Sequence, residues 1–105
     1  MNYPENIEEI KKFAEEIEID VKYLLGEKYE GNLWLDYIES LPANIVFNVG
    51  RNLNLYSVCS LPDNIVFNVG RNLVLNSVES LPSNVIFNVA GEVCFPLTHK
   101  VKVIW

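Results

Sequence analysis

The sequence has few of the residues that carry most enzyme chemistry. It holds a single histidine, His99, and two cysteines, Cys59 and Cys94, in 105 residues. Neither cysteine lies in a CxxC motif or a Cys/His cluster, so we expect buried or incidental thiols and no disulfide framework. Phosphate-binding loops, zinc-protease motifs and calcium-binding loops are also missing. We therefore expect no catalytic residues, no cofactor and no metal, and predict that the chain is not an enzyme.

Long hydrophobic runs are also missing. No apolar stretch approaches the roughly 18 residues of a membrane-spanning helix. The first residues, MNYPENIEEIKK, include acidic side chains and lack the hydrophobic segment of a secretory signal. Half of the residues are hydrophobic, which is enough for a core in one domain. The expectation is a soluble, cytoplasmic protein without a membrane partner.

Basic residues are scarce in the first part of the chain. Residues 1–40 hold eleven acidic residues and four lysines, a net charge of −7, whereas residues 41–105 carry a net charge of +1. An acidic head would repel phosphate groups, so we do not expect direct binding to nucleic acid. A basic surface on another protein is the partner that this charge favours.

The sequence does contain an internal repeat of 20 residues. The segment LPANIVFNVGRNL at 41–53 returns as LPDNIVFNVGRNL at 61–73, and a diverged copy, LPSNVIFNVAGEV, lies at 81–93. This period is too short for a helix pair and is typical of solenoids built from short strands. We predict a mostly β fold, a short β-solenoid of about 3.5 coils. The coils would be 31–50, 51–70 and 71–90, with a partial coil at 91–95.

Each coil has two stretches in which apolar and other residues alternate. Alternation with a period of two places the apolar side chains on one face of a strand. Stacked coils would then form ladders of leucine, phenylalanine and valine. Asparagines also recur at equivalent positions, and we predict that they bond to turns and to one another between coils.

The coil resembles bacterial and phage leucine-rich-repeat-like sequences with the pattern N-L-x-L-x-x-x-x-x-L-P-x-x-[IVL]. The Leu-Pro step also resembles the LPx class of bacterial leucine-rich repeats, and the resemblance covers about residues 31–95. The asparagine-turn consensus is only loosely met, and FNVGRN replaces the usual return segment. A compact, nearly straight solenoid is therefore as well supported as a horseshoe. The resemblance implies protein–protein recognition.

Solenoid ends are exposed sheet edges, and such edges need caps. Residues 1–30 are predicted to form an acidic helical cap, in which Asn6 and Glu9 fit a capping box and Gly26 ends the helix. Ile17, Ile19 and Val21 alternate, so the helix could instead end near Glu16 and continue as an extended segment. Residues 96–105 are predicted to form a closing strand, with lysines that protect its edge.

Three groups of residues are candidates for binding a partner. An apolar stripe is expected on the outer face of the second strands, unless the helical cap or a second chain covers it. Exposed aromatic residues are common in protein interfaces, and the acidic head supplies the third group. The candidates are Val46, Val66 and Ile86 in the stripe, the aromatic residues Trp34, Tyr37 and Tyr56, and the acidic residues Glu15, Glu16 and Glu18.

Two hypotheses about function follow. The first is a non-enzymatic protein–protein interaction module with an unidentified protein partner. One version of it is a small phage-encoded inhibitor of a bacterial defence protein, such as an anti-CRISPR, whose acidic head imitates phosphate charge. The alternative is a structural repeat protein that self-associates, for example as a homodimer through the valine stripe, and has no other partner.

Overall fold

The computed structural model of the chain describes residues 4–79 and 81–94. The predicted closing strand 96–105, the last residue of the partial coil and His99 lie outside the described residues. Within these two ranges, no helix has the length and apolar character needed to cross a membrane.

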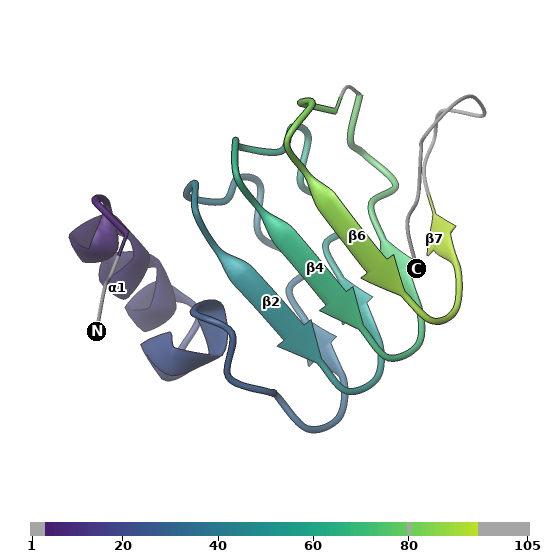
Figure 1. Cartoon of the computed structure of the whole chain (residues 1–105), viewed down its shortest axis with the longest axis horizontal. Helices are drawn as coiled ribbons and strands as arrows, with labels where there is room; N and C mark the ends of the chain where they lie inside the picture. The colour runs from purple at the N-terminus through teal and green to yellow at the C-terminus, as the bar shows by residue number, and fades with distance from the viewer. Residues whose placement is uncertain (1–3, 80, 95–105) are drawn as a thin grey trace.

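The repeats form two parallel sheets that face each other across the core. One sheet has the order β1 (Leu33–Trp34), β3 (Leu53–Asn54), β5 (Leu73–Val74) and β7 (Val93–Cys94). The other has the order β2 (Val46–Val49), β4 (Val66–Val69) and β6 (Ile86–Val89). Each strand pairs with the residues 20 positions further along the chain. The predicted β-solenoid, preceded by one helix, is confirmed (Figure 1).

The core is built from side chains at equivalent positions of successive coils. Phe47, Phe67 and Phe87 stack with ring centroids 5.6 and 5.5 Å apart and with nearly parallel planes. Such aromatic pairs contribute about 0.5–1.5 kcal/mol beyond the burial of their area. Leucine and valine rows on both sheets are buried in the same way. The inward alternation that the sequence predicts is therefore confirmed in both strands of the coil.

A row of asparagines links the coils at one turn. The Asn32 side-chain oxygen accepts hydrogen bonds from the backbone N–H and the side-chain amide of Asn52, both at 3.0 Å. The Asn52 oxygen accepts from the Asn72 N–H at 3.0 Å, and the Asn72 oxygen accepts from the Glu92 N–H at 2.9 Å. These side chains satisfy turn backbone groups that would otherwise need water, so the structural role predicted for this row is confirmed.

The helix α1 (Ile7–Glu16) lies against the N-terminal end of the solenoid, beside β2 (Figure 1). Its apolar face buries Ile10, Phe13 and Ala14. The prediction that Gly26 ends this helix is wrong, and the alternative end near Glu16 is correct. A short 3-10 helix, η1 (Val21–Leu24), follows.

A turn around Glu18 ends α1. The Ile19 N–H donates to the Ala14 carbonyl at 3.1 Å, and the Glu18 N–H donates to the Glu15 carbonyl at 3.2 Å. This pair of bonds is the Schellman arrangement, which requires a left-handed residue just after the helix. Glu18 holds that position with φ at 61°, where glycine is the usual residue. The helix therefore stops before Gly26 because its last carbonyls are already capped.

The segment after η1 closes one edge of the solenoid. Leu25 and Tyr29 form parallel bridges to Val46 and Val49 of β2. The Tyr29 N–H donates to the Asn48 carbonyl at 2.7 Å, and the Tyr29 carbonyl accepts from the Gly50 N–H at 2.9 Å. The N-terminal edge of the sheet β2–β4–β6 is thus paired within the chain.

The predicted capping box at Asn6 and Glu9 is wrong. The Asn6 side chain accepts no bond from a backbone N–H of α1, although its amide donates to the Glu9 carboxylate at 3.2 Å. The same amide donates to the Ala43 carbonyl at 2.9 Å, and the Asn6 side-chain oxygen accepts from the Asn44 amide at 2.9 Å. Asn84 donates to Asn64 in the same way. Asn6 therefore extends a bonding pattern of the solenoid and fixes α1 to the first coil.

Replacement of Asn6 by alanine should lower the free energy of unfolding by about 1–2 kcal/mol, because two bonds between helix and coil are lost. Glu9→Ala is the matched control, and it should change stability by less than about 0.5 kcal/mol. Urea unfolding followed by circular dichroism measures both. Equal losses in the two variants would restore the capping box and contradict the docking role of Asn6.

Replacement of Glu18 by glycine should stabilise the protein by about 0.5–1 kcal/mol, because glycine adopts the left-handed conformation without steric cost. Glu18→Ala removes the same charge but keeps the Cβ atom, so it should bring no such gain. Thermal unfolding of both variants compares them. A gain of equal size in the alanine variant would point to charge rather than to backbone conformation.

Candidate functional site

The predicted partner-binding residues lie on three surfaces. Val46, Val66 and Ile86 lie on the outer face of the sheet β2–β4–β6, and Trp34 lies on β1 of the other sheet. The remaining aromatic residues occupy turns, and the acidic residues lie at the end of α1. The structure brings only two of the nine, Glu16 and Tyr37, to the same groove.

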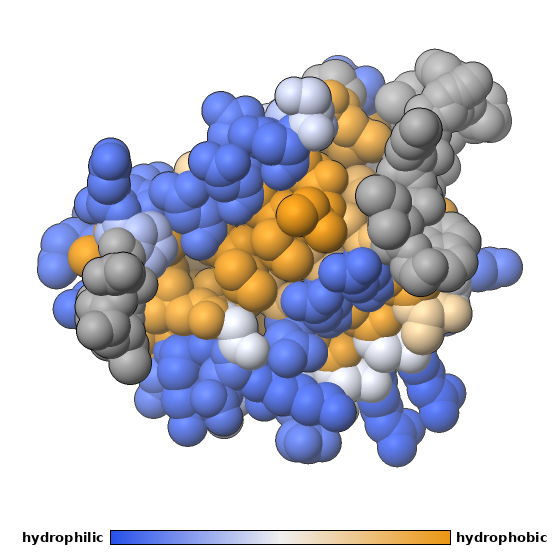
Figure 2. Space-filling model, in the orientation of Figure 1, coloured by the Kyte–Doolittle hydropathy of each residue, from blue (hydrophilic) through white to orange (hydrophobic). Residues whose placement is uncertain are grey.

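The apolar stripe runs across the strands of one sheet. Figure 2 shows hydrophobic surface crossing the face of β2, β4 and β6, with hydrophilic surface on both sides. Ile86 is 47% exposed, whereas Val46 and Val66 are half-buried. The helix α1 lies at the end of the solenoid and not over this face (Figure 1). The predicted alternative that the helical cap covers the stripe is therefore wrong.

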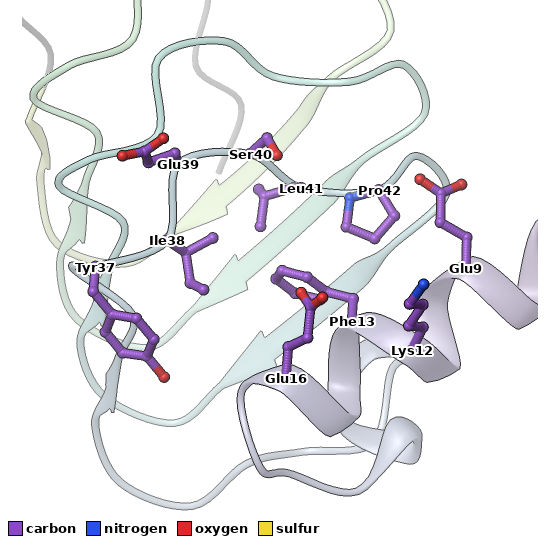
Figure 3. A pocket seen from close by; sticks show the side chains of 10 residues that line it. All are labelled: Glu9, Lys12, Phe13, Glu16, Tyr37, Ile38, Glu39, Ser40, Leu41 and Pro42. Atoms are coloured by element: carbon purple, nitrogen blue, oxygen red, sulfur yellow. The ribbon is translucent and has the colours of Figure 1, made fainter.

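A groove of about 460 Å³ separates α1 from residues 37–42 of the first coil. Figure 3 shows Phe13 and Glu16 rising from α1 toward Ile38 and Leu41 on the opposite segment. The lining combines an apolar floor with a polar rim. The floor comprises Phe13, Ile38, Leu41 and Pro42, and the rim comprises Glu9, Lys12, Glu16, Tyr37, Glu39 and Ser40.

The rim of the groove is acidic. Three carboxylates, those of Glu9, Glu16 and Glu39, stand against one lysine. In the part of the chain that the structure describes, the one ion pair joins Lys11 to Glu8 at 3.7 Å, outside the groove. The carboxylates of the rim are exposed and hold no basic partner there. They are thus accessible to positive charge from outside.

Helix geometry decides which acidic residues reach the groove. Residues seven apart on a helix share a face, so Glu9 and Glu16 both look toward the first coil. Glu15 is rotated by about 100° from Glu16 and does not line the groove. Glu18 lies in the turn beyond the helix. The spacing of Glu9 and Glu16 was a signal that the prediction from sequence did not use.

The aromatic candidates gather at the outer side of the first two coils. Trp34, Tyr37 and Tyr56 are each more than half exposed, at 56%, 62% and 53%. The Ser57 hydroxyl donates to the Asp36 carbonyl, so the turns that hold Tyr37 and Tyr56 lie side by side. Exposed aromatic rings next to an acidic groove are a composition found at protein interfaces.

The described residues offer little other chemistry. In the ranges 4–79 and 81–94, no group of three histidine, cysteine, aspartate or glutamate side chains could hold a metal ion. Cys59 is exposed rather than buried, and both cysteines are free thiols. No polar or charged side chain of the described residues is buried. The polar side chains of the groove are therefore accessible to solvent.

Comparison of the chain with protein-family models, curated proteins and solved structures finds no match.

Proposed function

We propose that the chain is a non-enzymatic protein-binding module that holds a basic segment of another protein in the groove between α1 and the first coil. The observation that carries the proposal is the set of exposed carboxylates of Glu9, Glu16 and Glu39 around an apolar floor. Tyr37 stands at the same rim and is 62% exposed.

A lysine or arginine side chain matches both parts of this groove. Its aliphatic stem can lie on the half-buried Ile38 while its charged end reaches the carboxylates. The Tyr37 ring can add a cation–π contact. Exposed ion pairs contribute only about 0.2–1 kcal/mol each. Most of the affinity must therefore come from the exposed aromatic residues beside the groove, since Phe13 and Leu41 are only 7% and 8% exposed.

An inhibitor of a nucleic-acid-binding protein is one form of this function. Such a target presents a basic groove for phosphates, and the acidic end of the chain would occupy that groove instead. A phage protein directed against a bacterial defence protein would belong to this class. Screening by salt would weaken the complex, because the carboxylates lie at the surface.

Self-association through the apolar stripe is the second candidate, because the outer face of β2, β4 and β6 stays uncovered by α1. A stable interface usually buries about 800 Å² on each partner. The stripe is one row of three side chains, of which Ile86 is 47% exposed and Val46 and Val66 are half-buried. The groove is therefore the better supported site.

Reversal of the charge of Glu16 should weaken capture of the partner several-fold, whereas the same reversal of Glu15 should leave it intact. Both residues are exposed on α1, but only Glu16 lines the groove. The measurement is an affinity pull-down from bacterial lysate with wild type, Glu16→Lys and Glu15→Lys, read by mass spectrometry at low and raised salt.

The matched control separates a groove contact from a general effect of charge. A partner that both variants lose equally would show that only net charge matters and would contradict the groove. Recovery of the bait alone, as a multimer, would reject the module and favour self-association. In that case Ile86→Lys should return the protein to a monomer.

A further inference from the structure

The two sheets of the solenoid end differently on the N-terminal side. The sheet β2–β4–β6 ends in a paired edge, because Leu25 and Tyr29 bridge to β2. The other sheet ends in β1, whose pairing with β3 is on one side only. Among residues 4–79 and 81–94, none forms a bridge to the outer side of β1.

The hydrogen bonds show which backbone groups remain on that side. The Leu33 N–H donates to the Asn52 carbonyl and the Leu35 N–H donates to the Asn54 carbonyl, both at 2.9 Å. Successive residues of a strand direct their N–H and C=O groups to opposite sides. The N–H and C=O groups of Trp34 therefore point away from β3, and no described residue bonds to them.

The surroundings of this edge suit a short basic strand. The Trp34 side chain is 56% exposed at the edge itself. Tyr37 follows three residues later, so the acidic groove begins within about 10 Å along the chain. An added strand that places a lysine toward the groove would meet Glu16 and Glu39, with the opposite charge.

We propose that the partner binds by strand addition: an extended, lysine-bearing segment of another protein pairs with the outer side of β1. The Trp34 N–H donates to a carbonyl of the segment, and the Trp34 carbonyl accepts from one of its N–H groups. Alternate side chains then pack on the Trp34 ring or reach the carboxylates of the groove. This inference rests on the proposed function, since both use the acidic groove.

Strand addition also explains why the edge is short. A long open edge would pair with any extended chain and promote aggregation, and short edge strands limit that hazard. β1 has two residues and one outward pair of backbone groups. Recognition therefore needs the side-chain contacts as well, which makes it selective for basic segments.

Backbone methylation of a peptide probe tests this inference without altering the protein. The probe is a short, end-blocked peptide of alternating lysines and valines, which has the charge and the β-propensity of the proposed segment. Two further peptides carry N-methyl groups, one on all lysine nitrogens and the other on all valine nitrogens. Binding is followed by NMR titration of the ¹⁵N-labelled full chain, with Glu16→Lys as the charge control.

Only one set of nitrogens can face β1 in an added strand. We expect one methylated peptide to bind about fivefold more weakly, because the peptide N–H that donates to the Trp34 carbonyl is lost, and the other to bind as the parent does. The Trp34 amide resonance should shift on binding, and Glu16→Lys should weaken all three peptides.

The outcomes separate the two proposals. Equal binding of all three peptides, with no shift at the Trp34 amide, would overturn strand addition and leave the acidic groove as a site for basic segments. Binding of none of them would overturn the groove and strand addition together.

Discussion

The backbone hydrogen bonds that join each coil to the next are the constraint on which this structure depends. Each strand pairs in parallel with the residues 20 positions ahead, so equivalent side chains lie above one another. The stacked phenylalanines and the bonded asparagines follow from that register. One coil could not bury its own apolar side chains. Its backbone groups are hydrogen-bonded, and its side chains covered, only where a neighbouring coil stacks on it. The first coil has no coil before it, so the N-terminal segment has to cover its core and pair with its strands.

The N-terminal segment closes that first coil only in part. Asn6 continues the bonding of the coil turns, α1 covers the end of the core, and Tyr29 pairs with the edge of β2. The outer side of β1 receives no such pairing from the described residues. The acidic groove lies between α1 and the first coil, next to that edge. The proposed binding site thus arises where the N-terminal segment, which is not part of the repeat, packs against the first coil of the solenoid.

The fold could be predicted from the sequence because the 20-residue period of the repeat gives the pairing register of the strands directly. Leu41–Leu53 and Leu61–Leu73 differ at one position, and their alternation gives the inward faces without further information. The cap carries no such signal. Asn6 bonds to Ala43, which lies 37 residues further along the chain. Glu18 adopts a left-handed conformation that the presence of a glutamate does not predict. The groove was missed for the same reason, since part of its wall comes from α1 and the rest from residues 37–42 of the first coil. Its charge and the shared helix face of Glu9 and Glu16 were visible in the sequence, but Glu39 becomes a neighbour of Glu16 only through folding.

Amide hydrogen exchange at the first coil tests most directly whether the N-terminal edge of β2 is paired while that of β1 is open. Backbone N–H groups held in hydrogen bonds exchange slowly with solvent, and unpaired exposed ones exchange fast. With an open β1 edge we expect slow exchange of the amides of Leu33, Leu35, Tyr29 and Gly50, and fast exchange of the Trp34 amide between two protected neighbours. Protection of Trp34 to the same degree as Leu33 would show that the chain pairs this edge itself. That result would contradict the account of an open β1 edge.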